Sequence, residues 1–209
     1  MTVDIKSKIE KWDSKLFLRI YQSSFLKHNS IRRFAKIYSF FGNIFFWGLF
    51  WLVLVIYGFF TYEFYLAFLI TGGFIQSMPL HAFIRYKLIS RNRPFITLEE
   101  KGVEKHDEII WKSSKSFPSG HVAFFIFFGF IIAFYCSQYF WEILSIFIIL
   151  NIVMAITRLI LGVHYPTDVI FGYIFGVIYA FLYYFTHIYW VMFFYWLGRI
   201  FFFVIHYLF

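Results

Sequence analysis

Long apolar runs follow one another from residue 35 almost to the end of the sequence, and each is close to the length of a membrane span. A transmembrane helix needs about 20 consecutive, mainly apolar residues. The 209-residue chain is 61% hydrophobic and only 14% charged, whereas a soluble domain carries about 25% charged residues. Aromatic residues make up 27% of the chain, and disordered chains are poor in them. The composition therefore excludes a soluble domain and a disordered chain, and it predicts an all-α membrane protein.

These runs predict a polytopic bundle of about six transmembrane helices. The predicted spans lie near residues 35–60, 63–86, 117–139, 141–161, 167–186 and 188–208. The last run contains Arg199 and His206, whose polar side chains are costly to place in lipid. We expect residues 35–209 to form a single transmembrane domain. An even number of spans would bring both ends of the chain to the same side of the membrane.

The N-terminal segment, residues 1–34, precedes the spans and has an amphipathic character. Its basic residues lie between apolar residues that are three or four positions apart, which is the period of a helix. These apolar residues are Ile5, Ile9, Trp12, Leu16 and Ile20. Because so charged a stretch does not span lipid, we predict that residues 4–26 form a helix on the membrane surface. A flexible tail is the alternative interpretation.

One long polar segment, residues 87–116, interrupts the apolar pattern between the second and third predicted spans. It mixes acidic and basic residues, namely Glu99, Glu100, Glu104, Asp107 and Glu108 with Lys101, Lys105, Lys112 and Lys115. Long loops in compact proteins are commonly functional or disordered. We therefore expect this loop to belong to the active site.

Helices that alternate in direction bring three distant groups of polar residues to one face of the membrane. The second predicted span ends, the third begins, the fourth ends and the fifth begins on the same side. Residues 87–93, 119–121 and 158–168 can therefore converge, although they are far apart in the sequence. Ionisable residues at the membrane-depth ends of helices are candidates for a functional site.

The converging groups contain three cations, two histidines and one carboxylate, which are Lys87, Arg93, Arg158, His121, His164 and Asp168. Arginine matches phosphate oxygens with a bidentate fork, and a helix N-terminus such as the one opened by Ser119 and Gly120 binds anions. Two histidines suit one nucleophile and one proton donor. A carboxylate four residues after His164 would orient its ring. This set predicts phosphoryl-transfer chemistry.

We expect no metal and no cofactor at this site. A zinc site would need more His, Cys or carboxylate ligands clustered together. The single cysteine, Cys136, lies inside an apolar run. Four other histidines match no motif and are assigned a structural or surface role, and they are His81, His106, His187 and His206.

At these residues the sequence resembles the type 2 phosphatidic acid phosphatase superfamily. Phe-Pro-Ser-Gly-His at 117–121 is similar to the second motif of that family. Thr157 and Arg158, followed by His164 and Asp168 at the family spacing, are similar to the third motif. Thr157 stands where the family usually has serine, which is a mild departure.

The first family motif, Lys-x6-Arg-Pro, is matched at its end by Arg93 and the proline after it. Lys87 is the expected lysine of this motif, but only five residues separate it from Arg93. One residue rotates a side chain by about 100° around a helix. Arg85 or Arg91 could take the place of Lys87.

The resemblance, which covers residues 35–186, implies a lipid phosphatase that acts through a phosphohistidine. It implies that His164 attacks phosphorus, that Asp168 orients His164, and that His121 protonates the leaving oxygen and then activates water. The phosphoryl oxygens would be held by Arg93, Arg158, Lys87, Ser119 and Gly120.

The implied substrate is a lipid phosphate whose tail stays in the bilayer. We expect a polyprenyl diphosphate such as undecaprenyl diphosphate, with phosphatidic acid and phosphatidylglycerol phosphate as alternatives. A lipid phosphotransferase and a non-catalytic lipid-binding protein are two further hypotheses. The expected partners are the lipid and the bilayer, not nucleic acid, and the oligomeric state is left open.

Two arguments about the membrane face of the site oppose each other. Of the 19 Lys and Arg residues, those outside the last apolar run all fall on the predicted active-site side, which the positive-inside rule places in the cytoplasm. Lipid phosphatases of the resembled family usually face outward. We expect a site at the outer face of the cell membrane.

Overall fold

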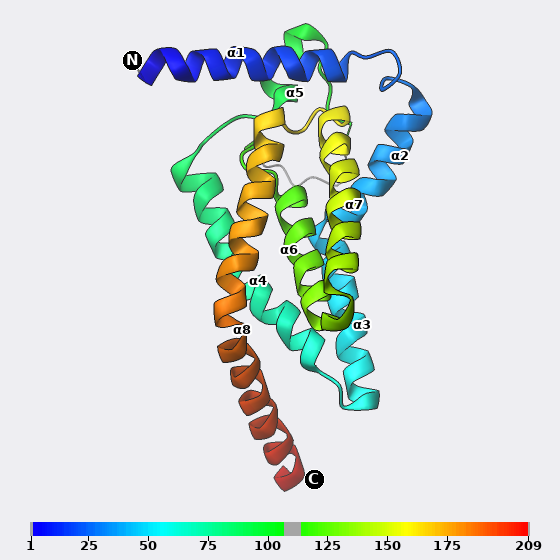
Figure 1. Ribbon diagram of the computed structural model, residues 1–209, viewed down its shortest axis with the longest axis vertical. Coiled ribbons are helices and arrows are strands. Elements are labelled where there is room, and N and C mark those ends of the chain that lie inside the picture. Colours follow the sequence, from blue (N-terminus) through cyan, green and yellow to red (C-terminus); the bar gives the residue numbers. More distant parts are fainter. Residues whose placement is uncertain (1, 107–113, 209) are drawn as a thin grey trace.

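The computed structural model describes residues 2–106 and 114–208, and helices dominate these ranges (Figure 1). The longer helices are α1 (Thr2–Tyr21), α2 (Asn29–Ser39), α3 (Ile44–Thr61), α4 (Tyr65–Phe83), α6 (Gly120–Tyr135), α7 (Phe140–Ile160) and α8 (Pro166–Leu208). The shorter ones are η1 (Phe40–Gly42), the π-helical η2 (Ile84–Leu88), α5 (Pro94–Thr97), η3 (Glu99–Lys101) and η4 (Ser137–Tyr139). Part of the expected polar loop, including Asp107, Glu108 and Lys112, lies outside the described residues.

Helix α6 forms the centre of the bundle. It packs against α7 and α8 and also contacts α4 and η1 (Figure 1). Its sequence is apolar on every side, and most of its residues are buried. A helix that is hydrophobic all round is one that other helices surround. The core therefore follows α6 and is rich in aromatic side chains such as Phe127 and Phe128.

The close contact between α6 and α8 depends on two glycines of α8, Gly172 and Gly176. A Cβ atom at Gly176 would overlap Cγ2 of Ile126, and one at Gly172 would lie 2.9 Å from the carbonyl oxygen of Ser119. Small residues let two helix backbones approach closely within a membrane. This approach brings the N-terminus of α6 against the first turns of α8.

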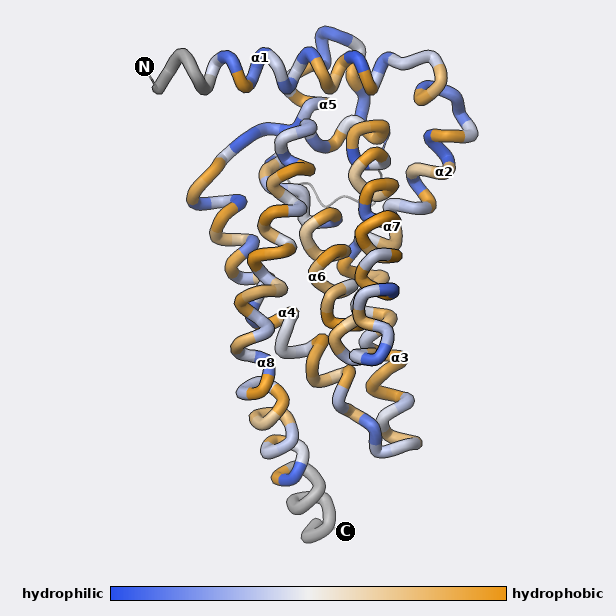
Figure 2. Tube along the Cα trace, viewed as in Figure 1, coloured by the Kyte–Doolittle hydropathy of each residue, from blue (hydrophilic) through white to orange (hydrophobic). Residues whose placement is uncertain are grey.

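Within the described residues, four helical segments are long and apolar enough to cross a membrane, and they are Ile44–Thr61, Tyr65–Leu88, Ser137–Ile160 and Pro166–Ile200. The predicted all-α bundle of membrane-length helices is confirmed, and apolar residues dominate these helices (Figure 2). The first span begins later than predicted, because the chain turns at η1. Asn43 then caps α3 by accepting from the N–H of Phe45 at 3.0 Å.

The last two predicted spans, 167–186 and 188–208, are one continuous helix, α8, of 43 residues. No proline or glycine lies near the predicted break. Thr186 and Trp190 both donate to the side-chain oxygen of Gln76 on α4, at 2.6 and 2.8 Å, and hold this part of α8 against the bundle. The prediction of a separate last span was therefore wrong.

The continuous α8 changes where the chain ends. The start of α1 and the end of α8 lie at opposite ends of the molecule, so the expectation that both termini share one side was also wrong (Figure 1). The alternation of the other helices agrees with the prediction. Helices α4 and α7 end, and α6 and α8 begin, toward the same end of the bundle (Figure 1).

Helix α6 starts deeper in the bundle than its neighbours do (Figure 1). The predicted span 117–139 contains a helix of only 16 residues. At 1.5 Å per residue this is about 24 Å, which is less than the roughly 30 Å of a bilayer core. The segment before α6 therefore dips into the bundle, and side chains of the first turn of α6 lie below its surface.

Helix α1 lies across the end of the bundle, over the tops of α7 and α8 (Figure 1). Asp13, Phe17 and Tyr21, spaced four residues apart, are buried, whereas Ile9 and Trp12 are about half exposed. The helix therefore has a protein-facing stripe that differs from the apolar face recognised in the sequence. Its basic residues point mainly away from the bundle, as the exposed positions along α1 show.

Replacing Gly176 by alanine should destabilise the protein, because the added Cβ would collide with Ile126 and Ala123 of α6. Overpacking of this kind costs about 1–3 kcal/mol. Gly198→Ala is the matched control on the same helix, since nothing lies within 4 Å of a Cβ there. Thermal unfolding of the detergent-solubilised protein measures both variants. A Gly176→Ala protein as stable as the Gly198→Ala protein would contradict the close packing of α6 on α8.

Candidate active site

Stretches of the chain that are distant in sequence are tied together at one end of the bundle by backbone hydrogen bonds. The N–H of Ser119 donates to the carbonyl of Asp168 at 2.9 Å, and the N–H of Phe95 donates to the carbonyl of Gly162 at 3.2 Å. These bonds join the segment before α6 to α8, and α5 to the turn between α7 and α8. The convergence of polar groups that the sequence predicts is therefore present in the structure.

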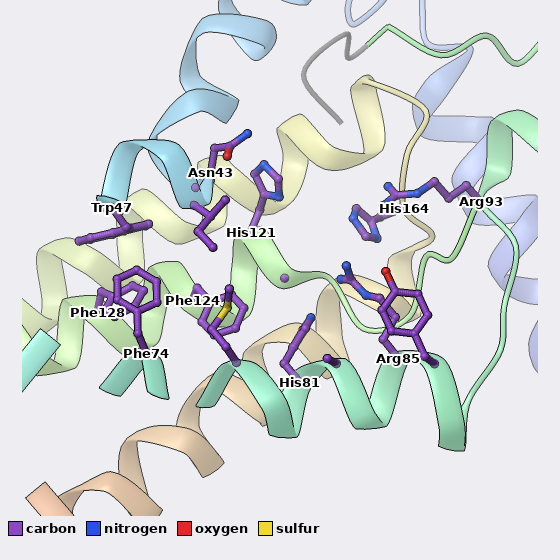
Figure 3. A pocket seen from close by; sticks show the side chains of 16 residues that line it. Asn43, Trp47, Phe74, His81, Arg85, Arg93, His121, Phe124, Phe128 and His164 are labelled. Carbon is purple, nitrogen blue, oxygen red and sulfur yellow. The ribbon is translucent and has the colours of Figure 1, made fainter. Parts of the chain in front are cut away.

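A cavity of about 350 Å³ opens beside this junction, between α3, α4 and α6 (Figure 3). Its volume is within the range of small-molecule sites, about 300–1,000 Å³. One end is polar and charged, and is lined by Arg85, Arg93, His81, His121 and His164. The other end is apolar, and is lined by Trp47, Phe74, Met78, Phe124 and Phe128. This shape suits a molecule that has an anionic head and an apolar chain.

The structure brings most of the predicted site residues to the charged end of the cavity. Four of them line it, and they are His121, His164, Arg93 and Gly120. Three are fully buried next to the lining residues, and they are Ser119, Arg158 and Asp168. Lys87 is exposed and lies outside the lining. Lys87, the expected lysine of the first motif, is therefore the one predicted residue that neither lines the cavity nor lies buried beside it.

Arg85 stands in the place expected for Lys87. Its guanidinium lines the cavity and donates to the carbonyl of Pro118 at 2.6 Å. Seven residues separate Arg85 from Arg93, one more than in the family motif, and η2 forms a π-helix over Ile84–Leu88. A π-helical turn closes with one residue more than an α-helical turn, and such bulges are frequent at functional sites. The bulge therefore offsets the longer spacing.

His164 lies in the turn between α7 and α8 and is almost completely buried. Burial lowers the pKa of its imidazole well below the ordinary value, and the nearby Arg93 and Arg158 lower the pKa further. This environment favours the neutral form of the ring, which is the form that can act as a nucleophile. Its Nδ1 lies 3.8 Å from Oδ2 of Asp168, so a positive charge on the ring would strengthen this contact.

The carboxylate of Asp168 is oriented by groups other than His164. Its Oδ2 accepts from the N–H of Tyr165 at 2.8 Å, and its Oδ1 accepts from Nη1 of Arg91 at 3.2 Å. Asp168 is fully buried, and a buried charge requires such hydrogen bonds. The carboxylate is thus fixed in the direction of the His164 ring before any substrate arrives.

Two further guanidinium groups are anchored near the histidines. Arg93 donates to the carbonyl of Val163 at 3.1 Å, and Arg158 donates to Oγ of Ser39 at the end of α2. Both arginines are buried. Fixed cations in a water-poor cavity stabilise the charge of a phosphoryl group better than cations in water do.

His81, which matches no sequence motif, also lines the cavity. Its Nδ1 is 3.1 Å from the hydroxyl of Tyr179, and its buried Nε2 has no hydrogen-bond partner among the described residues. A Cβ at Gly120 would lie 3.2 Å from both this Nε2 and Nη2 of Arg85. His81 precedes Arg85 by four residues, so both lie on one face of the helix. This spacing is the sequence signal that could have revealed His81.

The donor groups of the cavity suit an anion better than a cation. Within residues 2–106 and 114–208, no group of three or more His, Cys, Asp or Glu side chains could hold a metal ion. Cys136 follows the far end of α6, away from His121 in its first turn. Guanidinium groups bind phosphate and carboxylate oxygens through paired hydrogen bonds.

The fold and these residues agree with a known family. The sequence profile of the PAP2 superfamily matches residues 62–192, which is more than half of the chain. The chain therefore belongs to the PAP2 superfamily. No match to the chain is found among curated proteins.

Two crystal structures share the fold. Aquifex aeolicus LpxE is 22% identical to this chain, with 82% of this chain and 93% of that chain covered and a TM-score of 0.58. A transmembrane PAP2 type phosphatidylglycerolphosphate phosphatase from Bacillus subtilis is 20% identical, with 84% of each chain covered and a TM-score of 0.67. Together with the membrane-length apolar helices, this fold identifies the chain as an integral membrane protein.

Arg85 rather than Lys87 should determine how tightly the cavity binds a phosphate-like anion. A hydrogen bond to a charged group contributes about 1.5–3 kcal/mol. We therefore expect Arg85→Gln to weaken the binding of orthovanadate to the purified protein about 10- to 100-fold. Lys87→Gln is the matched control, and as an exposed charge it should change the Kd by less than about twofold. Equal losses in the two variants would contradict the assignment of Arg85 to the site.

Proposed function

We propose that the chain is a membrane phosphatase that hydrolyses the terminal phosphate of a lipid phosphate or diphosphate. The observation that carries the proposal is the pairing of His121 and His164 at the cationic end of a cavity whose other end is aromatic and apolar. Membership of the PAP2 superfamily supports this function. The likeness to a Bacillus subtilis phosphatidylglycerolphosphate phosphatase is consistent with it.

In the first step, Nε2 of His164 attacks the terminal phosphorus. Nδ1 of the same ring lies on the side of Asp168, so Nε2 is the nitrogen that faces a bound phosphate. An N–P bond forms and the P–O bond to the rest of the lipid breaks, with its electron pair passing to the leaving oxygen. His121 gives this oxygen a proton. Asp168 stabilises the ring of His164 while it is positive.

In the second step, water hydrolyses the phosphohistidine. His121 is now neutral and accepts a proton from the water, whose oxygen bonds to phosphorus. The N–P bond breaks, its electron pair returns to His164, and inorganic phosphate leaves. Phosphate monoesters hydrolyse so slowly that enzymes accelerate the reaction by up to ~10²¹-fold. Much of this acceleration must come from positioning and charge stabilisation.

The phosphoryl oxygens meet donors from several elements. Those we assign are the side chains of Arg85, Arg93, Arg158 and Ser119 and the N–H of Gly120. Oγ of Ser119 is buried and has no hydrogen-bond partner in the part of the chain that the structure describes. A buried hydroxyl without a partner is unfavourable, and a bound phosphate would supply the missing acceptor. No phosphate contact is assigned to Lys87, because it is exposed outside the cavity.

The apolar end of the cavity favours a substrate with a hydrocarbon tail. Trp47 of α3 and Phe74 of α4 line this end, and α3 is mostly unburied within the bundle. A tail could therefore extend from the cavity into the bilayer beside α3. We propose a polyprenyl diphosphate such as undecaprenyl diphosphate as the substrate, with phosphatidylglycerol phosphate and phosphatidic acid as alternatives.

Phosphate release from a panel of these lipids, in detergent or in vesicles, tests the function and names the substrate. Release from the diphosphate at the highest kcat/KM would support the polyprenyl assignment. Transfer of the phosphate to a second lipid instead of water would make the protein a phosphotransferase. Binding without release or transfer would make it a lipid-binding protein and would overturn the proposal.

His164→Ala should abolish phosphate release, because it removes the atom that attacks phosphorus. His187→Ala, on α8 and outside the cavity lining, is the matched control and should retain activity. The wild-type rate should be unchanged by EDTA, since the proposed steps use no metal. Retained turnover in His164→Ala would refute the nucleophile, and strong inhibition by EDTA would reveal a metal requirement.

His121→Ala should slow the cleavage of a phosphate monoester more than that of a diphosphate. A general acid increases the rate about 10²- to 10⁴-fold. It matters less for a diphosphate, because the leaving group is then a lipid phosphate, which is already stable as an anion. Steady-state rates for a lipid monophosphate and a lipid diphosphate give the ratio directly. Equal losses on both substrates would count against His121 as the proton donor.

We further propose that the site faces outward from the cell membrane. Four cations on this side of the protein form hydrogen bonds within the protein and are not presented to lipid headgroups, and they are Arg85, Arg91, Arg93 and Arg158. They therefore weaken the positive-inside argument for a cytoplasmic site. A cysteine introduced at the exposed Glu100, in a Cys136→Ser background, should react in intact cells with a reagent that does not cross membranes. Protection of that cysteine would place the site in the cytoplasm.

A further inference from the structure

A buried carboxylate connects helix α1 to the candidate active site. Asp13 of α1 is completely buried, although its helix lies at the surface of the bundle. One carboxylate oxygen accepts from the N–H of Thr167 at 3.0 Å. The other accepts from Oγ1 of Thr167 at 2.6 Å and from Nη2 of Arg91 at 2.5 Å. Asp13 therefore contacts the first turn of α8, directly before Asp168.

Arg91 lies between two carboxylates. Its Nη2 donates to Asp13, while its Nη1 donates to Oδ1 of Asp168 at 3.2 Å and to Oγ1 of Thr167 at 2.7 Å. Its guanidinium also lies over the ring of Tyr165, 3.8 Å from the centroid. The planar fork of arginine can satisfy both carboxylates at once in a way that the point charge of lysine cannot.

Because Arg91 binds both Asp13 and Asp168, its positive charge is shared between two carboxylates. This sharing affects the electrostatic potential at the ring of His164. Oδ1 of Asp168 faces Arg91, and Oδ2 faces Nδ1 of His164. Without Asp13, the whole positive charge of Arg91 would act on Asp168. That charge would oppose a positive ring at His164, because Asp168 and His164 are buried and Arg91 is only partly exposed, so solvent screens their interactions incompletely.

We propose that Asp13 is a positioning residue of the candidate active site. It binds one end of the Arg91 fork, and Asp168 is thereby left free to stabilise His164 while the ring carries a phosphoryl group. This inference rests on the proposed function, since it concerns the same histidine. It makes α1 a component of the site and not only a helix on the membrane surface.

Asp13→Asn tests this role with little change in shape. We expect kcat for phosphate release to fall about 10- to 100-fold, with KM changed by less than about twofold. Losses of this size are typical when a residue that orients the ligands of a metal site through hydrogen bonds is replaced. Glu10→Gln is the matched control, because it removes an exposed carboxylate from the same helix, three residues earlier. An unchanged kcat, or a loss confined to KM, would overturn the proposal.

A double-mutant cycle separates this role from simple anchoring of α1 through Thr167. In an Arg91→Gln background, Asp13→Asn should lose most of its effect on kcat, since Arg91 no longer carries a charge to divide. Equal losses in both backgrounds would show that Asp13 only anchors α1. If Asp13→Asn does not fold, Arg91→Lys is measured instead, where a reduced kcat supports the proposal and an unchanged kcat overturns it. A wild-type protein that releases no phosphate would refute the proposed function itself, and this inference with it.

Discussion

The structure depends on burying positive charges inside a bundle that lipid surrounds. An ion moved out of water loses several kcal/mol of hydration even after the protein relaxes, so each buried guanidinium needs oxygen acceptors. Backbone outside the long helices supplies acceptors for two of them, and the hydroxyl of Ser39 supplies one for Arg158. The carbonyl of Pro118 accepts from Arg85, and the carbonyl of Val163 accepts from Arg93. The segment before α6 and the turn before α8 are therefore shaped by the arginines that they bind, and the histidines lie between those arginines.

Much of the fold and of the site could be predicted because the signals are local or topological. The length of each apolar run identifies a helix, and alternation of direction then decides which helix ends meet. These two rules bring His121 and His164 to one end of the bundle without any knowledge of packing. The family motifs strengthen the prediction. The second and third motifs are local, so their residue spacing alone indicates which side chains lie together.

The features that the sequence did not reveal depend on contacts between distant segments. The π-helical η2 decides that Arg85, and not Lys87, faces the cavity, and a single sequence carries no clear signal for such a bulge. The burial of Asp13 depends on Arg91 and Thr167, which are 78 and 154 residues away. Within a basic, amphipathic stretch this carboxylate resembles any solvated side chain. Its environment is created only when α1 packs across the end of α8.

The length of α8 determines where the bilayer can end. Its apolar stretch has 35 residues, or about 52 Å of helix, against a hydrocarbon core of about 30 Å. Helix tilts reach about 40°, and at that angle only about 39 Å fits within the core. The helix must therefore leave the hydrocarbon before it ends. Exposed Tyr189, Tyr195 and Trp196 lie in this part of α8, and such rings favour the headgroup layer. In membranes of different thickness, the headgroup layer would lie at different aromatic residues along this part of α8, while the rest of the bundle stays unchanged.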